Sequence, residues 1–282
     1  MTTVYAVLHA LLSLLIPIPN LVLIVIVCKL IKRTQAKGYI FIINLAAADL
    51  LVGLMCVVET LDDVYDGDFD RSLTSCLLRI GFTISPCVAS VLTLLCISLD
   101  RWLAVSLPLR YCKMVTNRTI LAVLVALWSL SFLVGNLPLI APSLQQTNYT
   151  GFCGLLYSTG NHYLYVICFI VFMPVLLILL YVHIIMARIA FWQQRRIQQA
   201  GVLASPFTVH RPHFKALRTI LVVILGFCLS WGPYYITGLL QAACPQCNLK
   251  DLLKDPLFLL GEALNDYVTG VFPEDYDGSW QK

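Results

Sequence analysis

The chain has 282 residues, of which 59% are hydrophobic and 12% are charged, and its mean hydropathy is +0.83. Because a soluble domain carries about 25% charged residues, this composition excludes an ordinary soluble protein and indicates a membrane protein. The net charge of +4 fits a basic face against an anionic lipid leaflet and does not indicate a nucleic-acid-binding surface.

Apolar stretches long enough to cross a membrane recur along the whole chain. A helix needs roughly 20 residues to cross the hydrocarbon core, and seven such stretches occur, at about residues 4–28, 39–58, 76–101, 120–140, 163–187, 214–243 and 256–272. The first continues past Asn20 to Cys28, which does not fit a cleaved signal peptide. The sequence therefore predicts an all-α bundle of seven transmembrane helices over residues 1–272, followed by a short acidic segment at 273–282.

Lysine and arginine gather on one side of these predicted spans. Basic residues favour the cytoplasmic side of short loops, and most of the 19 in this chain follow spans one, three and five: Lys29, Lys32, Arg33, Lys37, Arg101, Arg110, Lys113, Arg118, Arg188, Arg195, Arg196, Arg211, Lys215 and Arg218. We therefore expect the N-terminus to lie outside the cell. The sequon at Asn148 would then face outward and be glycosylated, whereas the one at Asn117 would face the cytoplasm.

Four cysteines belong to the predicted outer side. Cys76 opens span three and Cys153 lies in the next outer loop, and they can pair because disulfides persist in an oxidising compartment. Cys244 and Cys247 lie in the last outer loop. These two could close a small disulfide ring, or bind a metal, although no second Cys or His pair completes such a site.

Span two contains a carboxylate, Asp49, inside an apolar helix. A charge near the bilayer centre costs about 2.5 to 3.5 kcal/mol and is retained mostly where it faces the interior of the bundle. With Asn20, Asn44 and Ser90, Asp49 could line a hydrated core that binds a proton or a cation such as sodium. The alternative is a hydrogen-bonded Asp that only holds helices together.

Six short motifs on six successive spans resemble those of the rhodopsin-like (class A) G-protein-coupled receptors. They are Asn20 in span one, LAAAD ending at Asp49 in span two, Cys76 and DRW at the two ends of span three, Trp128 in span four, Pro174 in span five, and CLSWGP in span six. The resemblance implies a multi-pass receptor of the plasma membrane that is not an enzyme, has no resident cofactor, and acts on a heterotrimeric G protein.

The resemblance also assigns a signalling role to Asp100 and Arg101. In the family the arginine turns toward the G protein on activation, and the carboxylate before it restrains it at rest. Trp102 stands where the family usually has tyrosine, and Pro108 and Tyr111 fall in the following loop, where the family presents a short helix to the G protein. The plain alternative is an interfacial arginine with its counter-ion.

Span six carries a second candidate switch, Trp231 and Pro233. Proline cannot donate to the helix ladder and kinks it, and a bulky tryptophan beside a kink can make the helix bistable. A kink without a signalling role is the alternative.

A narrower resemblance connects the chain with the receptors that include the glucose-dependent insulinotropic receptor. It rests on QQTNYTGFC in the second outer loop, FKALRTI and ITGLLQAACPQC at the ends of span six, and Arg79 three residues after Cys76. These receptors sense lipid amides and lysophospholipids and signal through the stimulatory G protein to raise cyclic AMP. The resemblance implies that Arg79 meets the polar head of the ligand, with further contacts from Phe82, Val88, Phe152, Phe169, Trp231 and Glu262. Arg79 could instead pair with the acidic first outer loop.

Two stretches depart from these relatives. The loop DDVYDGDFD holds five aspartates in nine residues, which we interpret as a solvated acidic loop, with weak calcium binding or a filter for cationic ligands as alternatives. After span seven begins, NDYVTGVFPEDYDGSWQK stands in place of the family's N-P-x-x-Y. Either Asn265 or Asp266 replaces the missing asparagine, or span seven is incomplete and the protein is a signalling-impaired or decoy receptor.

Other classes of membrane protein fit less well. The five histidines are scattered, and neither H-x-x-x-H nor G-x-S-x-G occurs, as an intramembrane hydrolase would require. A small-solute transporter would show inverted halves with paired broken helices. We therefore expect a receptor for a lipid-like ligand.

Overall fold

The computed structural model describes residues 10, 11, 13–34, 37–64, 72–147, 149, 151, 153–199 and 236. The predicted spans six and seven, residue 236 apart, lie outside the described residues. So do several residues singled out from the sequence, namely Asn148, Phe152, Trp231, Pro233, Cys244, Cys247, Glu262, Asn265 and Asp266.

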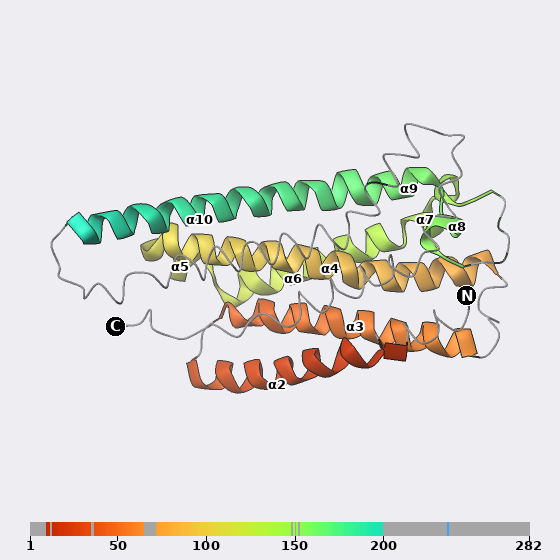
Figure 1. The fold of residues 1–282 in the computed structure, drawn as a ribbon, viewed down its shortest axis with the longest axis horizontal. Helices are drawn as coiled ribbons and strands as arrows, with labels where there is room; N and C mark the ends of the chain where they lie inside the picture. The colour runs from red at the N-terminus through yellow and green to blue at the C-terminus, as the bar shows by residue number, and fades with distance from the viewer. Residues whose placement is uncertain are drawn as a thin grey trace.

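The described part contains five helical segments long and apolar enough to cross a membrane. They are α2 (Pro17–Thr34), α3 (Tyr39–Val64), α4 (Leu73–Ser106), α6 (Asn117–Gly135), and a continuous run of α9 (Asn161–Tyr165), the π-helix η3 (Val166–Phe172) and α10 (Met173–Gln199). Their axes run side by side, with α4 between α3 and α10 (Figure 1). The predicted spans one to five are thereby confirmed.

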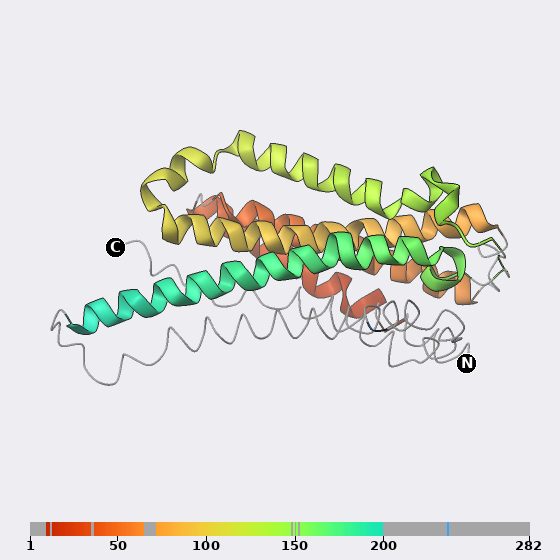
Figure 2. The same cartoon turned by 90° about the horizontal axis from the view of Figure 1, so that it is seen from above.

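Short elements gather at the two ends of the bundle. The helices α7 (Leu137–Ile140) and α8 (Leu155–Ser158), with the 3-10 turn η2 (Pro142–Leu144), lie at one end, and α5 (Pro108–Met114) lies at the other (Figure 1). The last turns of α2 and α10, which carry basic residues, share the α5 end, and α10 extends there beyond α4 and α6 (Figure 2). The basic end predicted to be cytoplasmic is thus opposite the end with α7 and α8.

The central helix α4 is longer than the sequence predicted. Its 34 residues correspond to about 51 Å at 1.5 Å per residue, well beyond the hydrocarbon thickness of about 30 Å. It continues past Asp100 and Arg101 to Ser106, so the prediction that this pair ends the helix was wrong. The helix stops where Pro108 disfavours the helical conformation of the residue before it, and Leu107 has φ −132° and ψ 56°.

Span five departs from a regular α-helix just before a proline. The π-helix ends at Phe172, and Pro174 follows in the first turn of α10. Because proline has no N–H and its ring displaces the carbonyl one turn earlier, a wider turn is accommodated at this place. Next to it, the main apolar core packs Tyr163, Ile167 and Phe172 against α4.

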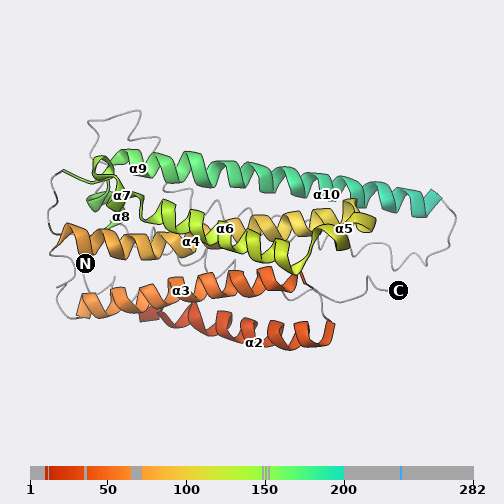
Figure 3. The same cartoon turned by 180° about the vertical axis from the view of Figure 1, so that it is seen from behind.

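The helix α2 lies along α3, on the side of α3 away from α10 (Figure 3). Leu23 and Val27 of α2 pack against Tyr39, Ile42 and Ala46 of α3 in a second apolar cluster. The opposite face of α2 exposes apolar side chains, as a face in contact with lipid requires.

Glycine residues allow α4 and α6 to approach closely near the outer end. A Cβ atom on Gly135 would lie 2.8 Å from the carbonyl oxygen of Gly81 and 2.9 Å from the backbone nitrogen of Ser85. Both are backbone atoms of a helix, which cannot move aside as a side chain can. The same end of α6 is also joined to α9, because the Tyr163 hydroxyl lies 3.0 Å from the carbonyl oxygens of both Val134 and Gly135 and donates to them.

We expect Gly135→Ala to destabilise this crossing by about 1 to 3 kcal/mol, the usual cost of overpacking. The readouts are the thermal stability of the detergent-solubilised protein and its surface expression. Ala126→Val is the matched control, because it adds carbon to an exposed position on the same helix. Equal stability of Gly135→Ala and the unchanged chain would contradict the close crossing.

Candidate functional site

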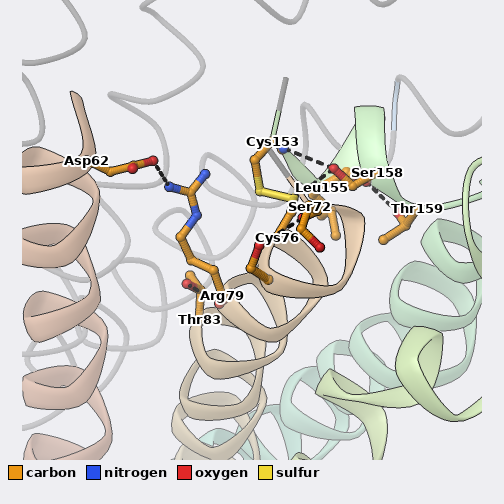
Figure 4. Close-up of a disulfide and its surroundings, with 11 residues drawn as sticks. Asp62, Ser72, Cys76, Arg79, Thr83, Cys153, Leu155, Ser158 and Thr159 are labelled. Carbon is orange, nitrogen blue, oxygen red and sulfur yellow. Dashed lines mark hydrogen bonds and ion pairs between the residues drawn. A yellow bond between two sulfur atoms is a disulfide. The ribbon is translucent and has the colours of Figure 1, made fainter. Parts of the chain in front are cut away.

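At the outer end, a disulfide ties the second outer loop to α4. Cys76 and Cys153 are bonded, with their Cα atoms 5.6 Å apart, which confirms the predicted pair (Figure 4). Ser158 is fully buried beside it, with its Oγ 3.0 Å from the Cys76 sulfur. The backbone N–H of Gly154 donates to the same hydroxyl at 3.3 Å, so the loop is held to the helix at more than one point.

One turn along α4 from this disulfide, Arg79 reaches across to α3. Its Nη1 lies 2.6 Å from Oδ2 of Asp62, and the two side chains are 14% and 5% exposed. Figure 4 shows the guanidinium pointing away from the disulfide and toward Asp62. The sequence left two roles for Arg79, contact with the ligand head group or pairing with the acidic outer loop. The described residues show the second, a pair with Asp62.

Asp62 is the first aspartate of the acidic loop that the sequence suggested was solvated. For this residue the interpretation was wrong, because Asp62 lies on the last turns of α3 and is buried against Arg79. Residues 65–71 of the loop lie outside the described part. Pairing of Arg79 with this acidic loop was one of the two alternatives predicted from the sequence, although it did not single out Asp62.

The described candidates for ligand contact lie in different surroundings. Phe82, on α4, is 52% exposed, and Phe169, in η3, is 39% exposed. Phe169 packs against Tyr165 with 6.2 Å between ring centroids. Val88 is fully buried in the core cluster between α4 and span five, where it packs against apolar neighbours. Their contact with a ligand stays a prediction.

In the middle of the bundle, one amide connects three helices. The side chain of Asn44 on α3 donates to Oγ1 of Thr93 on α4 at 2.8 Å and accepts from Nε1 of Trp128 on α6 at 2.9 Å. Thr93 in turn donates to the carbonyl oxygen of Ala89 at 2.6 Å. The sequence placed Asn44 and Trp128 separately but gave no sign that they bond to each other.

Five residues further along α3, the carboxylate of Asp49 is fully buried, as Asn20 is. Ser90 is also buried, and the residues next to Asp49 and Ser90, Ala48 and Ala89, pack in one cluster. A carboxylate with nearby hydroxyl groups is a donor set that suits a hard cation. A sodium ion at Asp49 therefore fits the residues present and stays a prediction.

At the cytoplasmic end, Asp100 is held by two partners. Its Oδ2 lies 3.5 Å from Nε of Arg101, and its Oδ1 accepts a hydrogen bond of 2.8 Å from the hydroxyl of Tyr111 on α5. Asp100 is buried, whereas about a third of the Arg101 side chain is exposed. The sequence identified Asp100 and Arg101, and the short helix expected around Pro108 and Tyr111 is present as α5. The bond from Tyr111 to Asp100 was missed.

The turn at Leu107 explains this contact. α4 ends there, α5 begins with Pro108, and the backbone N–H of Tyr111 donates to the carbonyl oxygen of Leu107 at 2.9 Å. The reversal carries Tyr111 back toward the end of α4 and leaves Leu109 92% exposed. Trp102, on α4 beside the pair, is partly buried.

Comparisons with known proteins agree with this arrangement. Residues 19–261 match the family described as 7 transmembrane receptor (rhodopsin family). The chain is 36% identical to the glucose-dependent insulinotropic receptor of Homo sapiens, over 91% of this chain and 78% of that receptor. It is 33% identical to the Rattus norvegicus receptor of the same name, over 91% and 56%.

More distant relatives include lysophosphatidic acid receptor 1-B of Xenopus laevis, which is 27% identical over 85% of this chain and 63% of that receptor. Adenosine receptors are among the further relatives. All of these are receptors, and none of their names denotes an enzyme. The chain belongs to the rhodopsin family of G-protein-coupled receptors, which are multi-pass proteins of the plasma membrane.

Proposed function

We propose that this receptor binds a lipid-like ligand, a lipid amide or a lysophospholipid, and raises cyclic AMP through the stimulatory G protein. The proposal is carried by the partly buried Arg79–Asp62 pair at the outer end of α4, in a chain that is 36% identical to the glucose-dependent insulinotropic receptor. Similarity to a receptor named for lysophosphatidic acid supports a ligand of the lipid class.

Arg79 is suited to bind the head group of such a ligand. A guanidinium offers several N–H donors in a fixed plane, which match phosphate and carbonyl oxygens. Since one donor already bonds Asp62 at 2.6 Å, a ligand oxygen would either share the guanidinium or displace the carboxylate. The apolar chain of the ligand would extend among aromatic side chains, for which Phe82 and Phe169 have exposed surface.

The cytoplasmic end is suited to activate a G protein by release of Arg101. At rest, Asp100 engages Arg101 and is itself held by Tyr111. When Arg101 separates from Asp100, its N–H groups can bond the G protein instead. Leu109 projects from α5 at the same end and is 92% exposed, and Arg110 and Lys113 flank it. An exposed apolar side chain with basic neighbours is suited to a protein contact at a membrane surface.

We expect Arg79→Ala to lower the potency of a lysophospholipid or lipid-amide agonist by about 10 to 150-fold, which corresponds to the 1.5 to 3 kcal/mol typical of a hydrogen bond to a charged group. Asp62→Asn should keep the arginine available and raise the potency of an agonist with an anionic head. Cyclic AMP dose–response curves at matched surface expression provide the measurement. Arg188→Ala, an exposed cation at the opposite end, is the control. Unchanged potency with reduced expression would make the pair purely structural.

We expect Asp100→Asn to raise basal signalling, since a restraint of about 1 to 3 kcal/mol corresponds to roughly 5 to 150-fold in the active population. Arg101→Ala should abolish coupling and leave agonist affinity unchanged, because Arg101 lies at the end opposite the proposed ligand site. Basal and stimulated cyclic AMP, together with ligand binding, measure both effects. The same substitutions are measured in a receptor whose span seven carries N-P-x-x-Y. This version tests the alternative that the unchanged chain is impaired in signalling. Normal coupling by Arg101→Ala in that version would reduce Arg101 to an interfacial anchor.

We expect Leu109→Ala to reduce agonist-stimulated nucleotide exchange by about 5 to 30-fold, as loss of 1 to 2 kcal/mol of apolar contact with the G protein would produce. Agonist affinity measured without G protein should not change, because Leu109 is 92% exposed and lies at the end opposite the proposed ligand site. Met114→Ala, at an exposed apolar position at the end of the same helix, is the control. An equal effect of the two substitutions would argue against a specific role for Leu109.

A further inference from the structure

The turn between α2 and α3 lies directly against the Asp100–Arg101 pair. A Cβ atom on Gly38 would lie 2.7 Å from Oδ2 of Asp100 and 3.0 Å from a terminal nitrogen of Arg101. The former distance is shorter than an ordinary carbon–oxygen contact of about 3.3 Å or more. Any residue other than glycine at this position therefore requires the carboxylate, the guanidinium or the turn to move.

The turn itself is held in place. The N–H of Ile40 donates to the carbonyl oxygen of Lys37 at 3.1 Å, and the N–H of Phe41 donates to that of Gly38 at 3.2 Å. The next residue, Tyr39, is buried in the cluster between α2 and α3. A side chain added at Gly38 would consequently displace the acid–base pair more readily than the backbone that carries it.

The two oxygens of Asp100 differ in their partners. Oδ1 accepts the hydrogen bond of Tyr111. Oδ2, the oxygen next to Gly38, accepts no hydrogen bond in the part of the chain that the structure describes, although it lies 3.5 Å from Nε of Arg101. Buried carboxylate oxygens usually have a hydrogen-bond donor. Gly38, which lies against Oδ2, has no side chain that could supply one.

We propose that Gly38 is a positioning residue that sets the strength of the Asp100–Arg101 restraint, and with it the basal activity of the receptor. The proposal rests on the proposed signalling function. The glycine lets the turn close over the pair while adding no hydrogen bond to Oδ2, so the carboxylate keeps Arg101 as its partner on that side. An alanine would push the carboxylate out of position and weaken the pair, whereas a serine could donate its hydroxyl to the displaced carboxylate and restore the restraint.

Two substitutions at Gly38 separate this role from simple steric damage. Gly38→Ala should raise basal nucleotide exchange by about five-fold, the lower end of the range for such couplings. Gly38→Ser, although larger, should have basal exchange close to or below that of the unchanged receptor. The measurement uses membranes containing the full-length receptor and a panel of purified heterotrimeric G proteins, at matched receptor density. Lys37→Ala, at the exposed neighbouring position, is the control and should have no effect.

A double substitution tests whether Gly38 acts through Asp100. Residues that act through one interaction are non-additive, so Gly38→Ala should add nothing in the Asp100→Asn background. A larger effect of serine than of alanine, or full additivity with Asp100→Asn, would overturn the role proposed for Gly38. If Asp100→Asn raises exchange and Gly38→Ala does not, the restraint stands and this inference fails. If neither changes exchange with any G protein, the restraint and the role of Gly38 are both rejected.

Discussion

The bonds of the Asn44 amide are the constraint on which the rest of the described structure depends. In the hydrocarbon region no water replaces a lost partner, and an unpaired polar group costs several kcal/mol. Asn44 meets this requirement by bonding Thr93 and Trp128 at once, which fixes α3, α4 and α6 relative to each other. Thr93 is satisfied further along its own helix by Ala89. Apolar packing and the close contact at Gly135 bring these helices together, and directional bonds of this kind help to set their rotation.

With α4 fixed at its middle, its two ends carry the two candidate sites. Arg79 and Arg101 are separated by 22 positions on one helix, or about 33 Å at the helical rise. Each arginine is paired with an aspartate, one from the neighbouring helix α3 and one adjacent in sequence. Pro86 lies between them inside the helix, where it removes one ladder hydrogen bond. A long helix weakened at one point, with an exchangeable ion pair at each end, can hold two arrangements that a ligand on one side and a G protein on the other select.

The sequence predicted the features that depend on composition and local order. The length of the apolar stretches predicted spans one to five, and the basic residues that follow spans one, three and five predicted which end of the bundle is cytoplasmic, the end that carries α5. The Cys76–Cys153 pair followed from placing both cysteines on the oxidising side. The end of α4 was misplaced because the hydrophobic run stops before the helix does, and only the proline at 108 ends the helix.

Contacts between distant residues were predicted less well: pairing of Arg79 with the acidic loop was one of two alternatives, and the bond from Tyr111 to Asp100 was not foreseen. Asp62 meets Arg79 from a different helix, and Tyr111 reaches Asp100 only because the chain reverses at Leu107. Such contacts depend on how one helix is rotated about its axis relative to another. A hydrophobic pattern determines this rotation angle only to within tens of degrees. Gly38 is the extreme case, since a residue without a side chain gives no sign in the sequence that its position is crowded.

The pairing of Arg79 also bears on which ligands the outer site can accept. The guanidinium is mostly buried and is already neutralised by Asp62 at 2.6 Å, so the pair presents little net charge to an approaching molecule. A ligand with a strong negative charge gains from Arg79 but must also face the nearby carboxylate, and removing one partner of a buried pair leaves a costly charge behind. A neutral amide carbonyl can accept from another N–H of the guanidinium without breaking the pair. A zwitterionic head can satisfy both members together. At the proposed lipid site, the ion pair would therefore favour neutral and zwitterionic head groups over purely anionic ones.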